Sequence, residues 1–279
     1  MKIAVTGASG MLGQALCRTF RDGFEVVPWR SRDMDITSFE DVRSKIARLR
    51  PDWIVNAAAY TDVDRAESEA VQACRVNALG SRHLAMAASE TGCRLLTFST
   101  DYVFDGESKR PYLESDPVCP INEYGRSKWM GEDYIRNLCR RHLIVRTSWL
   151  FGPGGRDFVD TMLLLAASAQ QVKVVEDQVG SPTFSRDLAA KTRELVEQDR
   201  RGTYHAANSG QCSKYEFACR TFEMSNLKVT VRPVPSSRFP GPAPRPRYSA
   251  LACQRLIQDG ISPLRPWQQA LAEYLESKQ

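Results

Sequence analysis

K-I-A-V-T-G-A-S-G-M-L-G-Q-A-L-C-R-T-F, residues 2–20, is the stretch from which the fold of this chain is predicted. Its apolar run at 2–6 predicts a short strand, and glycines follow at once as Gly7, Gly10 and Gly13. The apolar residues after them recur at helical spacing, so the glycines lie at a strand-to-helix turn. Such a turn lets the backbone approach a pyrophosphate, while the free amides at the helix start present the positive end of the helix dipole. The stretch therefore predicts a dinucleotide-binding site.

The same alternation of strand and helix continues along the chain. Apolar strands are predicted at 2–6, 25–29, 53–57, 94–99 and 143–149, separated by helical patterns and without β-hairpin signals. This order predicts an α/β fold of the Rossmann type, in which helices cover both faces of a doubly wound parallel sheet. Right-handed crossovers would bring the C-terminal ends of all strands to one rim.

The pattern becomes less regular after residue 150. We expect residues 1–150 to form the dinucleotide-binding domain, with 183–206 rejoining it. The segments 151–182 and 207–279 would form a smaller substrate-binding lobe that lies over the rim. Within this part, Ser185 is expected to cap a helix, because serine is a favourable residue before the first helical turn.

Composition excludes several classes of protein. The net charge is +5 and no block of five or six like charges occurs, so no nucleic-acid partner is expected. Apolar residues make up 42% of the chain but form no run long enough to cross a membrane. The eight cysteines include no C-x-x-C pair, which favours reduced packing residues over a metal site or disulfides. A cytoplasmic protein is expected.

The end of the second predicted strand bears on the choice of cofactor. An acidic residue there is typical of NAD-binding proteins, but this strand runs into W-R-S-R at 29–32. The guanidinium groups of Arg30 and Arg32 and the hydroxyl of Ser31 suit a 2′-phosphate, which favours NADPH, although Arg30 or Arg32 could be ordinary surface charges. Asp35 and Ile36 are placed for the adenine edge, or for the start of a helix capped by Thr37 or Ser38.

Tyr124 and Lys128 carry the predicted chemistry. They lie four residues apart at the start of a predicted helix, so they share one helical face, about 6 Å apart between their β-carbons. A neighbouring ammonium is expected to favour the phenolate and to bring the pKa of the tyrosine closer to neutrality. Thr100 follows the fourth predicted strand and would donate a hydrogen bond to a substrate oxygen. With a dinucleotide on the same rim, these three side chains predict hydride transfer to a carbonyl.

Several longer motifs carry a family resemblance. T-G-A-S-G-M-L-G and Y-G-R-S-K resemble the extended short-chain dehydrogenase/reductases. P-D-W-I-V-N-A-A-A-Y-T-D-V-D-R-A-E, F-S-T-D-Y-V-F-D-G, R-T-S-W-L-F-G and D-Q-V-G-S-P-T resemble the dTDP-4-dehydrorhamnose reductase family. The likeness covers about the first 190 residues well and continues weakly through R-P-R-Y-S-A-L near the end.

The resemblance implies an activity and a set of site residues. The activity would be NADPH-dependent reduction of the 4-keto group of dTDP-4-dehydro-L-rhamnose, with NADH accepted by some relatives. The implied catalytic residues are Tyr124 as proton donor, Lys128 on the cofactor ribose and Thr100. Cofactor positions fall on Gly7, Gly10, Met11, Leu12, Arg30, Asp35, Ile36, Ala59, Tyr60, Thr61, Tyr124 and Lys128. Substrate positions fall on Thr100, Asp101 and Trp149.

Three questions stay open at this level. The chain also resembles the regulatory β subunit of methionine adenosyltransferase, a binding partner, and a 4-ketoreductase for another nucleotide deoxysugar would have the same rim. Some relatives form homodimers through Mg²⁺ held by acidic residues, but those carboxylates cannot be matched here. Arg245 and Arg247, in the proline-rich segment 233–246 and just beyond it, are candidates for the diphosphate or for a solvated surface.

Overall fold

A parallel six-stranded sheet forms the centre of the computed structural model, which describes residues 1–278. Its strands are β1 (Lys2–Thr6), β2 (Glu25–Trp29), β3 (Trp53–Asn56), β4 (Arg94–Thr100), β5 (His142–Thr147) and β10 (Gly202–His205). The strand order is β10-β5-β4-β3-β1-β2, and every pairing is parallel. The order reverses between β1 and β3, which is where open α/β sheets bind ligands. The predicted Rossmann-type fold is confirmed.

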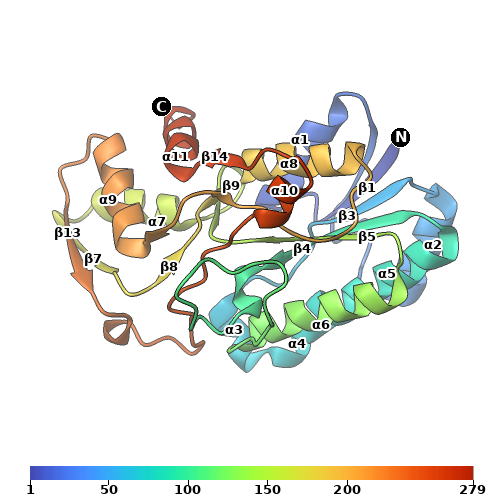
Figure 1. The fold of residues 1–279 in the computed structure, drawn as a ribbon, viewed down its shortest axis with the longest axis horizontal. Coiled ribbons are helices and arrows are strands. Elements are labelled where there is room, and N and C mark those ends of the chain that lie inside the picture. Colours follow the sequence, from blue (N-terminus) through green and yellow to red (C-terminus); the bar gives the residue numbers. More distant parts are fainter. Residues whose placement is uncertain (279) are drawn as a thin grey trace.

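Helices cover both faces of this sheet (Figure 1). One face is covered by α1 (Met11–Arg21) and α8 (Ser185–Glu197), with the short α10 (Gln254–Gln258) beside them. The other face is covered by α2 (Phe39–Leu49), α5 (Gly80–Thr91) and α6 (Glu123–Leu138). The strands between the two layers are apolar on both sides, so each layer has its own hydrophobic core.

The segment between β3 and α5 is helical over most of its length. It consists of α3 (Val63–Ser68), α4 (Ala70–Cys74) and a π-helical turn, η1 (Arg75–Leu79), which runs directly into α5. π-Helical turns occur frequently at functional sites. Here the turn carries Asn77, whose side chain is buried.

The C-terminal part adds a smaller lobe beside the sheet (Figure 1). Helices α7 (Phe158–Ala166), α9 (Lys214–Met224) and α11 (Trp267–Glu276) pack there, together with the parallel pair β7 (Gln171–Val175) and β13 (Thr230–Val234). Its core is aromatic and contains Phe151, Phe184, Phe217, Trp267 and Tyr274.

Three two-residue pairings connect the lobe to the rim. They are β6 (Leu150–Phe151) with β9 (Thr183–Phe184), β8 (Val179–Gly180) with β12 (Cys212–Ser213), and β11 (Asn208–Ser209) with β14 (Leu264–Pro266). The short 3₁₀ helices are η2 (Asp101–Val103) and η3 (Ser236–Arg238), the latter inside the proline-rich segment.

Ser185 does not have the expected role. The residue at the cap of α8 is Phe184, and Ser185 is already the first helical residue. Its buried hydroxyl has no hydrogen-bond partner among residues 1–278. The two-residue strand β9 extends up to Phe184 and therefore shifts the helix start by one residue.

Candidate active site

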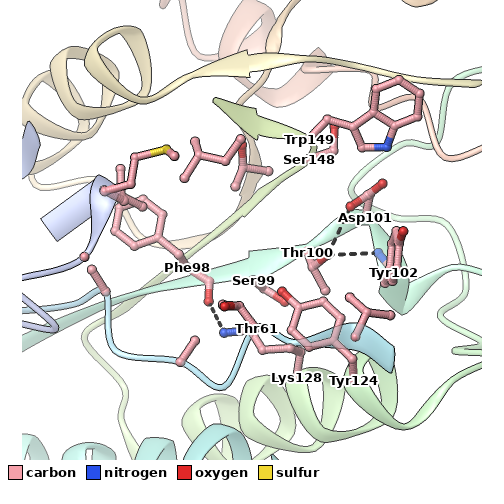
Figure 2. Close-up of a pocket in the computed structure, with 18 of the residues that line it drawn as sticks. Thr61, Phe98, Ser99, Thr100, Asp101, Tyr102, Tyr124, Lys128, Ser148 and Trp149 are labelled. Atoms are coloured by element: carbon pink, nitrogen blue, oxygen red, sulfur yellow. Dashed lines mark hydrogen bonds between the residues drawn. The ribbon is translucent and has the colours of Figure 1, made fainter. Parts of the chain in front are cut away.

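A cavity of about 630 Å³ opens where the ends of β4 and β5 meet α6 and the lobe (Figure 2). The residues that the sequence assigned to chemistry line it together: Gly10, Met11, Leu12, Ala59, Thr61, Thr100, Asp101, Tyr124, Lys128 and Trp149. The lining also contains Phe98, Ser99, Tyr102, Thr147, Arg156 and Lys214, which the sequence did not single out.

Helix α6 places Tyr124 beside the end of β4. The side chain of Asn122 caps this helix by accepting a hydrogen bond from the Gly125 amide at 2.7 Å. A β-carbon at Gly125 would lie 2.1 Å from the carbonyl oxygen of Tyr102, so glycine is needed for the helix to approach η2. The rings of Tyr102 and Tyr124 then meet edge to face, with centroids 5.8 Å apart. The phenol is therefore held at the rim in the first turn of the helix.

Lys128 lies one turn further along the same helix and is buried. Its Nζ donates a hydrogen bond to the carbonyl oxygen of Phe98 at 2.7 Å (Figure 2). Burial lowers the pKa of this ammonium to about 8, and the nearby Glu132 carboxylate opposes that shift. Lys128 is thus charged at neutral pH and loses its proton in mildly alkaline solution.

The pKa of Tyr124 moves opposite to the expectation. Burial raises it to about 12, while the hydroxyl of Thr100 lowers it in part. Lys128 is not among the groups that shift this pKa. In this cavity desolvation of the phenolate therefore decides the direction of the pKa. The phenol keeps its proton at neutral pH, which is the form that a proton donor requires.

Thr100 and Asp101 form a hydrogen-bonded unit at the end of β4. The Thr100 hydroxyl donates to Asp101 Oδ1 at 3.0 Å and accepts from the Tyr102 amide at 3.1 Å (Figure 2). Asp101 Oδ2 accepts a hydrogen bond from the Ser249 hydroxyl at 2.5 Å. Burial raises the pKa of Asp101 to about 6, and its two hydroxyl partners oppose that shift. The Thr100 hydroxyl must rotate away from Asp101 before it can donate to a substrate oxygen.

Trp149 lies just beyond β5, which ends at Thr147 rather than at residue 149. Its backbone is in the left-handed region at φ 43°, an uncommon conformation for a bulky residue. The backbone of Gly180 packs on the indole, since a β-carbon there would lie 2.5 Å from Trp149 Cε2. The ring is therefore fixed in the wall of the cavity.

The glycine turn borders a second cavity of about 500 Å³. Gly7, Gly10, Asp35, Ile36 and Ala59 line it, and so does Ser31. Gly10 stands at the cap of α1 and provides no capping side chain, and the first turn holds no acidic residue. The amides at the start of α1 are thus left for an anionic group. A β-carbon at Gly13 would lie 2.1 Å from the Gly7 carbonyl oxygen, so the turn tolerates only glycine there.

This arrangement fits a dinucleotide across both cavities. The glycine turn lies between them, because Gly10 and Ala59 line both. Thr147 Oγ1 is buried in the first cavity without a hydrogen-bond partner in the part of the chain that the structure describes. A bound polar ligand would supply such a partner.

Two of the cofactor residues expected from the sequence lie outside both linings. The Tyr60 hydroxyl points away and donates to Glu69 at 2.9 Å, while its amide donates to Asn77 Oδ1 at 2.9 Å. Asn77 also donates to the Tyr60 carbonyl and to Ser127, so it fixes the backbone that precedes Thr61. Arg30 is exposed and borders neither cavity.

Arg245 is not an isolated surface charge. Its guanidinium binds Asp64 at 2.7 Å, which links the proline-rich segment to α3. Arg247 is exposed.

Residues 1–278 contain no group of three or more histidine, cysteine or acidic side chains arranged to hold a metal ion. None of the helices described for these residues is long and apolar enough to cross a membrane.

Residues 1–279 match the protein family described as RmlD substrate binding domain. The chain is 41% identical over 278 residues to the spore coat polysaccharide biosynthesis protein SpsK of Bacillus subtilis, covering 99% of this chain and 98% of that protein. It is 42% identical over 282 residues to dTDP-4-dehydrorhamnose reductase of Mycobacterium tuberculosis, covering 98% and 92% respectively. The crystal structure of dTDP-4-dehydrorhamnose reductase from Bacillus anthracis in complex with NADP matches with a TM-score of 0.97 and 38% identity, covering 99% of both chains.

Proposed function

The chain belongs to the RmlD substrate binding domain family, and on that basis we propose that it reduces dTDP-4-dehydro-L-rhamnose to dTDP-L-rhamnose with NADPH. The observation that carries the proposal is the meeting of Thr100, Tyr124 and Lys128 in one cavity that borders the glycine turn. A regulatory binding partner would have no need of this constellation. The relatives named above as reductases support the same activity.

The bound NADPH would supply the hydride for the carbonyl carbon. Tyr124 would donate its proton to the carbonyl oxygen, and its high pKa keeps that proton available across the neutral range. The ammonium of Lys128 would bind the cofactor ribose. Thr100, once released from Asp101, would donate a hydrogen bond to the same carbonyl oxygen.

The binding residues divide between the two ligands. Gly7, Gly10, Met11, Leu12, Asp35, Ile36, Ala59 and Thr61 would hold the dinucleotide, and the backbone at Tyr60 would support this wall. Ser31 borders the second cavity and would contact a 2′-phosphate there. Its exposed neighbour Arg30 would have to turn inward to reach the same phosphate. Asp101 and Trp149 would contact the sugar nucleotide.

The decisive measurement is NADPH oxidation, followed by absorbance, with the dTDP-4-keto sugar generated in place by the preceding enzymes. We expect oxidation that depends on the keto sugar and is faster with NADPH than with NADH. Thr100→Val should reduce turnover by about a hundredfold to a thousandfold, in the range of other oxyanion donors. NADPH binding without oxidation, across several nucleotide keto sugars, would refute the reductase and favour the regulatory partner.

A further inference from the structure

We propose that Lys214 binds the diphosphate of the nucleotide sugar, at the end of the cavity between Trp149 and Asp101. The inference rests on the proposed function, because it concerns the same substrate. It assigns the diphosphate contact to a residue of the lobe other than Arg245 and Arg247, which were the candidates from the sequence.

The fold fixes the position of Lys214. It is the first residue of α9 and follows the cap residue Ser213. Ser213 and Glu216 form a reciprocal capping box around this helix start. Its own amide donates to the carbonyl oxygen of Gln178 at 3.1 Å, which anchors this end of the helix to the loop before β8. The side chain then extends into the lining of the cavity. Its Nζ lies 3.4 Å from the centroid of the Trp149 ring and 4.8 Å from that of Phe158.

The ammonium of Lys214 has no anionic partner in residues 1–278. No carboxylate lies within ion-pair distance of it, and Nζ makes no hydrogen bond within the described chain. Asp101 is the carboxylate that acts on the pKa of Lys214. Both of its oxygens already accept hydrogen bonds, one from Thr100 and one from Ser249. The Trp149 ring compensates the charge only in part, because the attraction of an indole ring for a cation supplies no negative charge.

A diphosphate suits this environment better than a sugar hydroxyl. The titratable groups that act on Lys214 are Asp101 from η2, Cys212 from β12 and Arg245 from the proline-rich segment. Burial lowers the pKa of Lys214 to about 7, and the positive charge of Arg245 contributes to that shift. Lys214 lines this end of the cavity, and of these two cations only Arg245 is paired with a carboxylate, that of Asp64. A phosphate would supply the missing negative charge, whereas a neutral hydroxyl would leave the half-buried ammonium uncompensated.

The other cations of the cavity are placed differently. Lys128 is bound to the carbonyl of Phe98 below Tyr124. Arg156 lies next to Gly155, which packs against Met11 at the start of α1, on the side of the glycine turn. Lys214 is therefore the lining cation on the side of Asp101 and Trp149, within the described residues.

Binding of an anion next to Lys214 should draw in a proton. An ammonium that is partly deprotonated near neutral pH becomes fully protonated when a negative charge lies against it. The affinity for the diphosphate should then fall as the pH rises from about 7 through the alkaline range. An arginine at this position stays charged and should remove that dependence.

Calorimetric titration of dTDP, without NADPH turnover, tests the proposal. We expect Lys214→Met to weaken dTDP binding by about tenfold or more, the usual loss for a charge-assisted hydrogen bond. Lys214→Arg should retain most of the affinity, and Lys228→Met, an exposed lysine of the same lobe, should match the wild type. Titrations in buffers of different ionisation enthalpy should show proton uptake above pH 7 in the wild type that Lys214→Arg lacks.

The outcomes separate the two proposals. A wild-type protein that neither binds dTDP nor oxidises NADPH with the keto sugar contradicts the proposed function. If the wild type binds dTDP and Lys214→Met changes that affinity by less than about twofold, the role of Lys214 is overturned. The same conclusion follows if Lys214→Met weakens the binding of dTDP-L-rhamnose but not of dTDP. NADPH affinity serves as the folding control for Lys214→Met. If that variant does not fold, equal proton uptake by the wild type and Lys214→Arg overturns the proposal by itself.

Discussion

Replacing Tyr124 with Phe removes the proposed proton donor while keeping the aromatic ring. The edge-to-face contact with Tyr102, at 5.8 Å between centroids, needs no hydroxyl and should persist. Lys128 keeps its hydrogen bond to Phe98, so the wall that would bind the ribose is unchanged. We therefore expect NADPH affinity and thermal stability close to those of the wild type.

The size of the catalytic effect follows from the protonation state. With a pKa of about 12, only about one phenol in 10⁵ is ionised at pH 7, so nearly every wild-type molecule has a protonated Tyr124. Loss of general acid catalysis usually costs 10² to 10⁴ in rate, or about 3–5 kcal/mol of transition-state stabilisation. Thr100 stays in place and should leave a measurable residual rate.

Single-turnover and steady-state oxidation of NADPH with the keto sugar would measure this effect, with NADPH affinity taken from fluorescence titration. Tyr134→Phe, which alters a tyrosine on the same helix outside the cavity lining, is the matched control. A Tyr124→Phe enzyme within about tenfold of the wild-type turnover would refute the assignment of Tyr124 as the acid. A parallel loss of NADPH affinity would show instead that the substitution disturbed the cofactor wall.

Three further predictions address the cofactor and the buried charges. NADPH affinity should weaken as the pH rises through about 8, because Lys128 has a lowered pKa and loses its charge there. The NADPH affinity of Lys128→Arg should not change over this pH range. A wild-type affinity that is equally independent of pH would contradict the ribose contact. Gly13→Ala should abolish tight NADPH binding and destabilise the protein by about 1–3 kcal/mol, since its β-carbon would meet the Gly7 carbonyl oxygen at 2.1 Å; unchanged binding and denaturant midpoint would count against the tight turn. Glu132→Gln should lower the free energy of unfolding by about 3–5 kcal/mol in denaturant titration, because the buried Arg146 guanidinium loses the carboxylate that it binds at 2.8 Å; a change below about 1 kcal/mol would mean that solvent reaches the pair.

The convergence of Thr100, Tyr124 and Lys128 was predictable because local rules place all three. Thr100 ends a buried strand, and in a parallel sheet all strand ends of one kind meet at the same rim. Tyr124 and Lys128 share a helical face through their spacing alone. The glycine turn likewise follows from its place between a strand and a helix. Sequence reasoning reached these residues without knowledge of the tertiary contacts.

Other features depend on contacts that no local pattern encodes. Lys214 enters the cavity only because the pairing of β8 with β12 brings the start of α9 to the rim. Ser249 binds Asp101 across 148 positions of sequence. The direction of the Tyr124 pKa depends on how deeply the phenol is buried, and spacing to a lysine does not report burial. Tyr60 turns away because Asn77 holds its backbone.

The edge of the main sheet has a consequence for synthesis on the ribosome. Strand β10 (Gly202–His205) completes the sheet by pairing with β5, yet it is translated only after the first part of the lobe. Until then β5, whose Leu143, Ile144 and Val145 are buried in the finished protein, would present an open, apolar edge. Open apolar edges recruit other strands and promote aggregation. We therefore expect a chain truncated at residue 150 to aggregate, and the nascent chain to become protected only once residues past 205 have left the exit tunnel.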